Sequence, residues 1–236
     1  MIDRGNLLIV GGSRGIGLAL AIEALAKYSR VTVIAREEID KIKELKINFI
    51  SQDFNDVELI RHTLEIVQPS TLILCVAQGL YGNISDFPND KVISCVQTTY
   101  LSTIIWLKEA ILVLPVGSRI AWISSLTAKI KSNNWSFYAS AKAGVEHFIR
   151  CIRESAKDRG IDITICYPGC LATEFHERSG TQSSKDAIDP SEIANDLLEA
   201  IDNRLEFWVS YLDKEAIEKA YQLDEIYQHK FKDSLK

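Results

Sequence analysis

The sequence lacks the long apolar run that a membrane-spanning helix requires. No stretch approaches the roughly 20 apolar residues needed to cross a bilayer. Residues 104–116 are interrupted by Lys108 and Glu109 and contain Pro115 near their end, which favours a buried amphipathic helix. Only five residues precede the first apolar run, which leaves no room for a signal peptide, so we expect a cytoplasmic protein that does not bind membranes.

A block of basic residues is absent as well. The 27 Lys and Arg residues are outnumbered by 32 Asp and Glu residues, and the formal net charge is −5. Clusters such as Lys41, Lys43 and Lys46 are too short to follow a phosphate backbone and are typical of solvated helix faces. We therefore expect no nucleic-acid partner.

Paired cysteines are also missing. The five cysteines are an odd number, spread between positions 75 and 170, which is typical of reduced thiols in the cytoplasm. Cys166 and Cys170 suggest a metal-binding pair, but no second pair and no suitably spaced histidine accompanies them. The sequence thus predicts no metal site.

What the sequence does contain is an alternation of short apolar runs with helix-like segments. Hydrophobic residues make up 47% of the chain, enough for a sizeable core. The runs show no polar alternation, as expected of parallel strands covered by helices on both faces. Strands are predicted at residues 7–10, 31–35, 47–50, 72–76, 119–123, 161–166 and 207–212. The pattern predicts one doubly wound α/β domain over residues 1–236, a Rossmann domain with a parallel sheet of about seven strands and helices on both faces.

Helices are predicted between these strands from apolar residues spaced three and four apart. Another helix is expected to begin at Asp189, because an Asp at the N-cap followed by Pro190 in the first turn is a common helix start. The other predicted helices span residues 16–27, 57–67, 143–152 and, at the end of the chain, 213–232.

A glycine-rich turn joins the first predicted strand to the first predicted helix. Residues 11–17 read Gly-Gly-Ser-Arg-Gly-Ile-Gly. Glycines at this place permit a tight turn and allow the backbone to approach a pyrophosphate lying on the helix N-terminus. The Gly-Lys-Ser/Thr of a nucleoside triphosphate loop is absent. A tight turn without a ligand is the alternative interpretation.

Tyr138 and Lys142 stand four positions apart, a spacing that places both side chains on one face of a helix. An ammonium beside a phenol lowers the tyrosine pKa from about 10, so the tyrosine can pass a proton to a developing alkoxide. Ser125 lies thirteen residues before Tyr138, just past a predicted strand, where a hydroxyl can bond a substrate oxygen as charge builds on it. Taken alone, the pair also fits a core tyrosine beside a surface lysine.

Together these elements resemble the short-chain dehydrogenase/reductase family over nearly the whole chain. The Gly-x-x-x-Gly-x-Gly spacing is matched, as is the separation of Ser125, Tyr138 and Lys142. The resemblance implies an NAD(P)-dependent oxidoreductase in which Ser125 polarises a carbonyl and Tyr138 is the general acid in reduction. It also implies that Lys142 binds the nicotinamide ribose and lowers the pKa of Tyr138. The implied cofactor contacts are Gly11, Ser13, Arg14, Gly15, Ile16, Gly17, Arg36, Asp53, Phe54, Ala77, Tyr138, Lys142, Pro168, Gly169 and Thr173.

Two arginines indicate which dinucleotide is preferred. In NAD-using members of the family an acidic residue about 20 residues after the turn bonds the ribose 2′-hydroxyl, whereas this sequence has Ala35 and Arg36 there. A guanidinium binds the 2′-phosphate that a carboxylate would repel, and Arg14 adds a second cation, so we predict NADP(H) over NAD(H). The alternative is that Arg36 merely begins the next helix. Asp53 resembles the family's adenine-contacting Asp, and it equally suits a helix cap with Phe54 stacking beside it.

Three places depart from the family pattern. Val10 replaces the usual threonine before the first glycine. Residues 75–79 read Cys-Val-Ala-Gln-Gly in place of Asn-Asn-Ala-Gly, with Ala77 retained and Gly79 as a shifted glycine. The family also has an asparagine in the next long helix, which supports a water that relays protons to the lysine. Its best counterpart here is Gln97, which we predict as a fourth catalytic residue.

The resemblance implies an NADPH-dependent carbonyl reductase acting on a small or medium ketone or aldehyde. Trp135 and Phe137 are expected to wall its pocket, and His176 is a candidate substrate contact. The alternative is a non-catalytic NADP-binding sensor or scaffold protein on the same fold, which Gln97 and the altered residues 75–79 leave open.

The resemblance also bears on two other activities and on the oligomeric state. The acidic surface disfavours a 3-oxoacyl reductase of lipid synthesis, and a sugar-nucleotide epimerase normally needs a longer C-terminal region. Family members usually pair through the long helices that here carry Gln97 and Tyr138, so a homodimer or homotetramer is expected.

Overall fold

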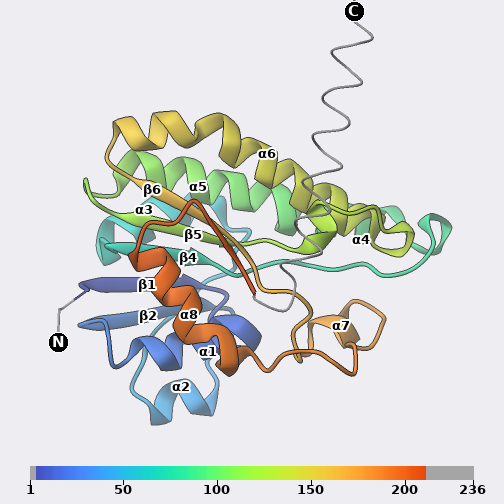
Figure 1. Cartoon of the computed structure of the whole chain (residues 1–236), viewed down its shortest axis with the longest axis horizontal. Coiled ribbons are helices and arrows are strands. Elements are labelled where there is room, and N and C mark those ends of the chain that lie inside the picture. Colours follow the sequence, from blue (N-terminus) through green and yellow to red (C-terminus); the bar gives the residue numbers. More distant parts are fainter. Residues whose placement is uncertain (1–3, 211–236) are drawn as a thin grey trace, which may run out of the picture.

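A sheet of seven parallel strands divides the molecule into two helical layers (Figure 1). The computed structural model describes residues 4–210, and within this range the strand order is β3-β2-β1-β4-β5-β6-β7. This is the predicted doubly wound arrangement, and the fold class is confirmed. The strands are β1 (Asn6–Val10), β2 (Arg30–Ala35), β3 (Asn48–Ser51), β4 (Thr71–Leu74), β5 (Arg119–Ile123), β6 (Asp162–Tyr167) and β7 (Phe207–Val209).

The central strands are buried on both faces, which is why their sequences show no polar alternation. All four residues of β4 are buried, as are the last four residues of β1 and β5. Val10 at the end of β1 pairs with Ile34 of β2 and Leu74 of β4, which aligns the ends of the three strands. The last predicted strand is confirmed over Phe207–Val209, whereas positions 211 and 212 and the predicted helix 213–232 lie outside the described residues.

Helices α3, α5 and α6 cover one face of the sheet, and α1, α2 and α8 cover the other (Figure 1). Asp189 caps α8 through a 2.8 Å bond from the Ser191 N–H to its carboxylate, as predicted. The predicted helix over residues 143–152 is the middle of the longer helix α6, which begins at Ser136 and therefore includes Tyr138 and Lys142. The helices are α1 (Gly15–Ala24), α2 (Asp40–Glu44), α3 (Val57–Val67), α4 (Asn89–Val96), α5 (Ser102–Val113), α6 (Ser136–Asp158), α7 (Phe175–Arg178) and α8 (Pro190–Asp202).

A π-helical turn over Gln97–Leu101 links α4 directly to α5. Such a turn inserts extra backbone into an otherwise continuous helix, so it rotates the residues on its two sides relative to each other. This rotation decides which residues of the segment face the sheet.

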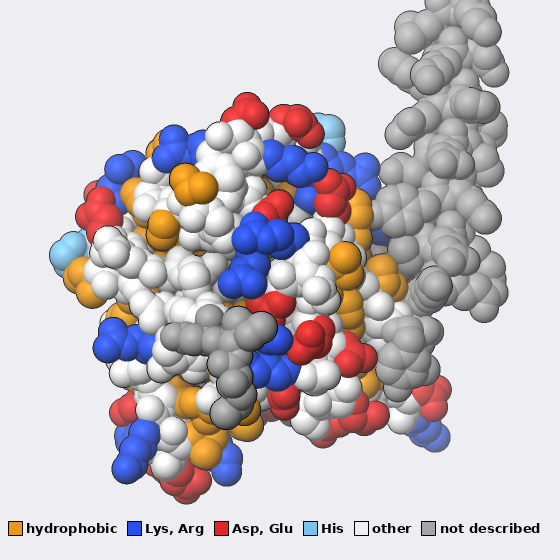
Figure 2. Space-filling model, turned by 60° about the vertical axis from the view of Figure 1, so that its left-hand side comes forward, with side chains coloured by type: hydrophobic (Ala, Val, Ile, Leu, Met, Phe, Trp, Pro, Cys, Tyr) orange, Lys and Arg blue, Asp and Glu red, His pale blue; other side chains and the backbone are white. Residues whose placement is uncertain are grey.

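The surface carries mixed charge. In the view of Figure 2, basic and acidic side chains are interspersed and neither forms an extended patch. Arg4 and Arg119, for example, both pair with Asp202. Among the helices of residues 4–210, none is long and apolar enough to cross a bilayer.

Candidate active site

The predicted site residues converge at the carboxyl ends of the strands. From β1 the strand order runs outward to β3, and from β4 it runs the other way to β7, so the winding reverses between β1 and β4. Open α/β sheets bind ligands at such a reversal. The chain leaves β1, β4, β5 and β6 at this edge, and these four exits lead to the glycine turn, Ala77, Ser125, and Pro168 with Gly169.

The glycine turn is tightly built and leaves the start of α1 open to an anion. Gly11 and Gly15 have φ angles of +85° and +52°, and a Cβ on Gly17 would lie 2.3 Å from the Gly11 carbonyl oxygen. Arg14 at the N-cap makes no side-chain capping bond, and the first turn of α1 contains no acidic residue. The free N–H groups there suit a pyrophosphate. Ile16 can contribute only its backbone, because its side chain belongs to the core.

The two predicted phosphate-binding arginines differ in their surroundings. Arg36 is exposed directly after β2 and has no ion pair with another described residue. Arg14 pairs with Glu174 at 3.1 Å, and Glu174 also pairs with Arg178. Arg36 is thus free to bind a 2′-phosphate, whereas the charge of Arg14 is partly neutralised by Glu174.

The segment after β3 changes one expectation. The Asp53 carboxylate is exposed and accepts a 2.8 Å bond from the Asn55 N–H, but the N-cap of α3 is Asp56, so Asp53 is not the helix cap. The Phe54 ring is 6% exposed and stacks on Trp106 in the core, so the predicted contact of this residue with the cofactor would be made by its backbone.

Ser125, Tyr138 and Lys142 lie together, as their positions predicted. Ser125 follows β5, and its oxygen accepts bonds from the Thr127 N–H at 3.3 Å and the Thr127 hydroxyl at 3.0 Å. Tyr138 lies in the first turn of α6, close enough to Ser125 for that side chain to affect its pKa. Lys142 lies one helical turn further on. Two hydroxyls therefore meet beside a buried amine.

Burial sets the protonation of this group. Lys142 is 2% exposed, and its ammonium donates to the Ile123 carbonyl at 2.6 Å and lies 4.8 Å from the centre of the Trp122 ring. Burial lowers its pKa to about 7. Burial also raises the pKa of Tyr138, and the Ser125 side chain opposes this shift only in part. The predicted lowering of the Tyr138 pKa is therefore not found in this structure, because the amine bonds a backbone carbonyl and lies 5.7 Å from the centre of the phenol ring.

The role predicted for Gln97 stays a prediction. Its amide donates to Ser102 at 3.4 Å. Three neighbouring side chains contact the segment after β4: Cys95 and Thr99 bond the backbone of Gln78, and Ser94 bonds its side chain. The sequence feature that could have indicated Cys95 and Thr99 is their four-residue spacing, which places two small polar side chains on one face of a helix.

A segment after β6 closes over the site. The side chain of Thr173 lies against the glycine turn, 3.2 Å from where a Cβ on Gly15 would stand. Phe175 packs on Tyr138 with ring centres 5.3 Å apart, and a Cβ on Gly79 would lie 2.8 Å from the Phe175 ring. This segment therefore connects the glycine turn to the catalytic tyrosine.

The three predicted pocket residues differ in their contacts. Trp135 contacts the Tyr138 ring at 5.4 Å. His176 lies 6.0 Å from Trp135, with its Nε2 atom 3.5 Å from the Cys170 sulfur. Phe137 packs edge-on against Phe87 at 6.1 Å and belongs to the apolar cluster around Tyr138. The direct ring contacts to Tyr138 come from Trp135 and Phe175.

Comparison with protein families gives a match over most of the chain. Residues 6–184 match the model of the family described as short chain dehydrogenase. Versicolorin reductase 1 of Dothistroma septosporum is 26% identical over 190 residues, which cover 74% of this chain and 72% of the relative. The 3-ketodihydrosphingosine reductase of Mus musculus is 24% identical over 185 residues, and the match covers 69% of this chain but 55% of that longer protein.

Solved structures show the same fold. A short-chain dehydrogenase from Sphingobium yanoikuyae in complex with NADPH superposes with a TM-score of 0.82 at 18% sequence identity. The superposition covers 97% of this chain and 95% of the other. The likeness therefore extends across both helical layers.

Proposed function

Because the chain belongs to the short chain dehydrogenase family and is thus an NAD(P)-dependent oxidoreductase, we propose that it reduces a ketone or aldehyde to an alcohol with NADPH. The observation that carries the proposal is the convergence of the Ser125 and Tyr138 side chains, with Lys142 one turn further along α6. Two hydroxyls at one point can both bond a single carbonyl oxygen. The reductase names of the relatives support this direction of reaction.

The dinucleotide is held by the glycine turn and by the segment around Thr173. The open N-terminus of α1 suits its pyrophosphate, and Arg36 with Arg14 suits a 2′-phosphate. The Sphingobium enzyme was solved with NADPH, which supports the same choice here. When bound, the reduced cofactor supplies a hydride to the carbonyl carbon.

The protein's own part is to polarise the carbonyl and to supply a proton. Ser125 and Tyr138 donate hydrogen bonds to the carbonyl oxygen, and both bonds strengthen as negative charge builds there. Tyr138 transfers its proton to that oxygen, which completes the alcohol and leaves a phenolate. In its ammonium form Lys142 stabilises this phenolate, which is reprotonated from solvent.

The proposal is tested by binding and turnover. NADPH and NADH are titrated while tryptophan fluorescence is followed, and a panel of ketones and aldehydes is then assayed. We expect the wild-type protein to bind NADPH more tightly than NADH. In Tyr138→Phe, kcat/KM should fall by a factor of about 10²–10⁴, while the affinity for NADPH stays unchanged. Tyr100→Phe is the matched control, because it also removes one phenol oxygen but lies on the π-helical turn before α5.

Each other outcome has a definite meaning. Full turnover in Tyr138→Phe removes the tyrosine from the mechanism. NADPH binding without turnover of any carbonyl favours the sensor or scaffold alternative. If neither dinucleotide binds, the proposed function is wrong.

A further inference from the structure

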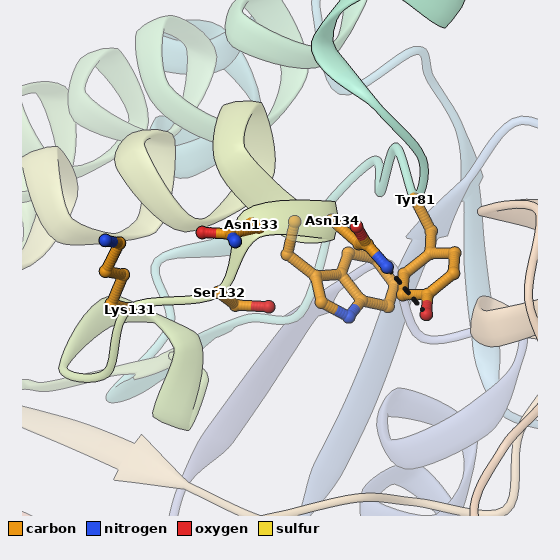
Figure 3. Close-up of a pocket in the computed structure, with 6 residues that line it drawn as sticks. Tyr81, Lys131, Ser132, Asn133 and Asn134 are labelled. Atoms are coloured by element: carbon orange, nitrogen blue, oxygen red, sulfur yellow. Dashed lines mark hydrogen bonds between the residues drawn. The ribbon is translucent and has the colours of Figure 1, made fainter.

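An open polar pocket of about 730 Å³ (Figure 3) is lined in part by Trp135, whose ring contacts Tyr138. In Figure 3 Lys131 lies at one end of this pocket and Tyr81 at the other. All but one of its residues belong to the segment that leads into α6, which positions it beside Tyr138. The pocket is lined by Tyr81, Lys131, Ser132, Asn133, Asn134 and Trp135.

Trp135 is shared between the pocket and the catalytic group. Its ring lies 5.4 Å from the Tyr138 ring and 5.2 Å from the Tyr81 ring, which meets it edge-on. Phe175 stacks on the indole at 5.9 Å, and His176 meets it edge-on at 6.0 Å. A ligand that lies along the indole therefore extends from the catalytic hydroxyls into the pocket.

The pocket is held in shape by contacts between two loops. The Asn134 amide donates to the Tyr81 hydroxyl at 3.1 Å, the dashed line in Figure 3. The Gly82 N–H donates to the Asn134 carbonyl at 3.0 Å. These two bonds fix the end of the pocket opposite Lys131 before any ligand arrives, which lowers the entropic cost of binding.

The lining has one cation and no anion. Lys131 is exposed and has no ion pair with another described residue, whereas nearby Lys129 pairs with the buried carboxylate of Glu146. The remaining polar lining is neutral: the hydroxyls of Ser132 and Tyr81, the amides of Asn133 and Asn134, and the indole N–H of Trp135. An uncompensated ammonium beside neutral donors is suited to a group with a single negative charge.

We propose, on the basis of the carbonyl reductase function above, that this pocket binds a carboxylate at the far end of the substrate. The substrates are therefore oxo acids, in which a short carbon chain lies along Trp135 and the carboxylate reaches Lys131. A monoanion fits better than a phosphate ester, because the second negative charge of a phosphate would have no cation in the pocket.

The test compares oxo acids with their methyl esters. Methyl ketones with a terminal carboxylate, from 4-oxopentanoate to 7-oxooctanoate, are assayed with NADPH beside the ester of each. We expect a lower KM for the acid at the chain length that fits. Lys131→Gln should raise this KM about two- to fivefold, because an ion pair with an exposed ammonium is weak, with little change in kcat and none in the KM of the ester.

Two variants show whether the effect comes from the positive charge at position 131 or from any loss of a surface positive charge. Lys131→Arg keeps the cation and should retain most of the preference for the acid. Lys43→Gln removes the same charge from the exposed surface of α2, where the lysine only approaches Asp40 at 3.8 Å, and should leave both KM values unchanged. A thermal melt of each variant confirms folding.

The failure of this inference is distinct from the failure of the proposed function. If acids and esters are both reduced with equal KM, or if Lys131→Gln affects them equally, the carboxylate site is wrong and the reductase stands. If neither is reduced while other carbonyls are, the oxo acid substrate class is wrong. If no carbonyl is reduced, both proposals are overturned.

Discussion

Lys142 is buried in the interior of the site, and its ionisation controls both catalysis and stability. An ammonium in this position loses most of its hydration, and in return it has one carbonyl and the face of an indole ring. Burial consequently lowers its pKa from 10.5 to about 7. Near neutral pH the folded protein without ligand is a mixture of molecules with charged and neutral Lys142.

This shift predicts how stability changes with pH. Below the folded pKa of about 7, the amine is protonated in both the folded and the unfolded chain. Between this value and 10.5 the unfolded chain binds a proton that the folded protein does not, so raising the pH stabilises the folded protein. From about pH 6.5 to about pH 8.5 we expect a gain of about 2 kcal/mol, or about 4–8 °C in Tm, relative to Lys142→Met.

The measurement is a series of thermal melts of the two proteins without cofactor. The range ends below pH 9 because burial raises the pKa of Cys75 and Cys166, and raised thiol pKa values make stability fall with pH once the unfolded thiols ionise. Parallel Tm curves for wild type and Lys142→Met would show that the amine has an ordinary pKa.

At the scale of elements, the segment that carries α7 joins the two halves of the site. It contacts the glycine turn through Thr173 and Glu174 and the catalytic tyrosine through Phe175. Glu174 stands at the cation expected to bind a 2′-phosphate, so the phosphate must displace this carboxylate to reach Arg14. Binding of NADP(H), which carries a 2′-phosphate, is therefore expected to affect the position of the α7 segment, whereas binding of NAD(H) is not.

Removing this carboxylate is expected to favour NADPH. Glu174→Gln frees Arg14 and removes a negative charge that repels the 2′-phosphate, so the Kd for NADPH should fall about two- to fivefold, since exposed ion pairs are weak. The Kd for NADH should not change. Glu177→Gln, which removes an exposed carboxylate from the same short helix, is the control, and both constants are read from fluorescence titrations at low salt. Equal effects on both dinucleotides would contradict a role at the 2′-phosphate.

The sequence predicted those elements whose signal is local. Unbroken apolar runs gave the strands, and a cap with a following proline gave the start of α8. Ser125, Tyr138 and Lys142 were predictable because strand ends meet at one edge of a parallel sheet and a four-residue spacing joins two side chains on a helix. The relative order of these three residues along the chain was sufficient to predict that their side chains lie together.

Other features depend on contacts between distant segments and were not predictable. The burial that raises the pKa of Tyr138 depends on Phe175, which lies far along the chain. The bond from Gln97 to Ser102 was not predictable, because a π-helical turn changes the helix face without a sequence pattern of its own. The core position of the Phe54 ring was not predictable, because an aromatic side chain after a strand suits a cofactor and a core equally well until its neighbour Trp106 is known.

At the scale of the whole molecule, the helical layer of α4, α5 and α6 exposes large apolar side chains on its outer surface. Ile93, Leu101 and Leu112 are 66%, 40% and 44% exposed. Ile93 lies on α4, Leu101 on the π-helical turn and Leu112 on α5. Together these elements form the long helix carrying Gln97, one of the two helices predicted to mediate pairing. Exposed apolar side chains along such a helix are typical of an interface between copies of one chain.

We expect a dimer, with a mass twice the 26.5 kDa of one chain, in light scattering after size exclusion. Leu101→Glu combined with Leu112→Glu should yield a monomer, because two buried charges without partners oppose association more strongly than two leucines favour it. The control is Ile22→Glu, at a residue of similar exposure (39%) on α1, across the sheet. If the double variant keeps the wild-type mass, pairing does not use this face. If dissociation abolishes turnover while NADPH still binds, pairing holds the segment that leads into α6 in its active position.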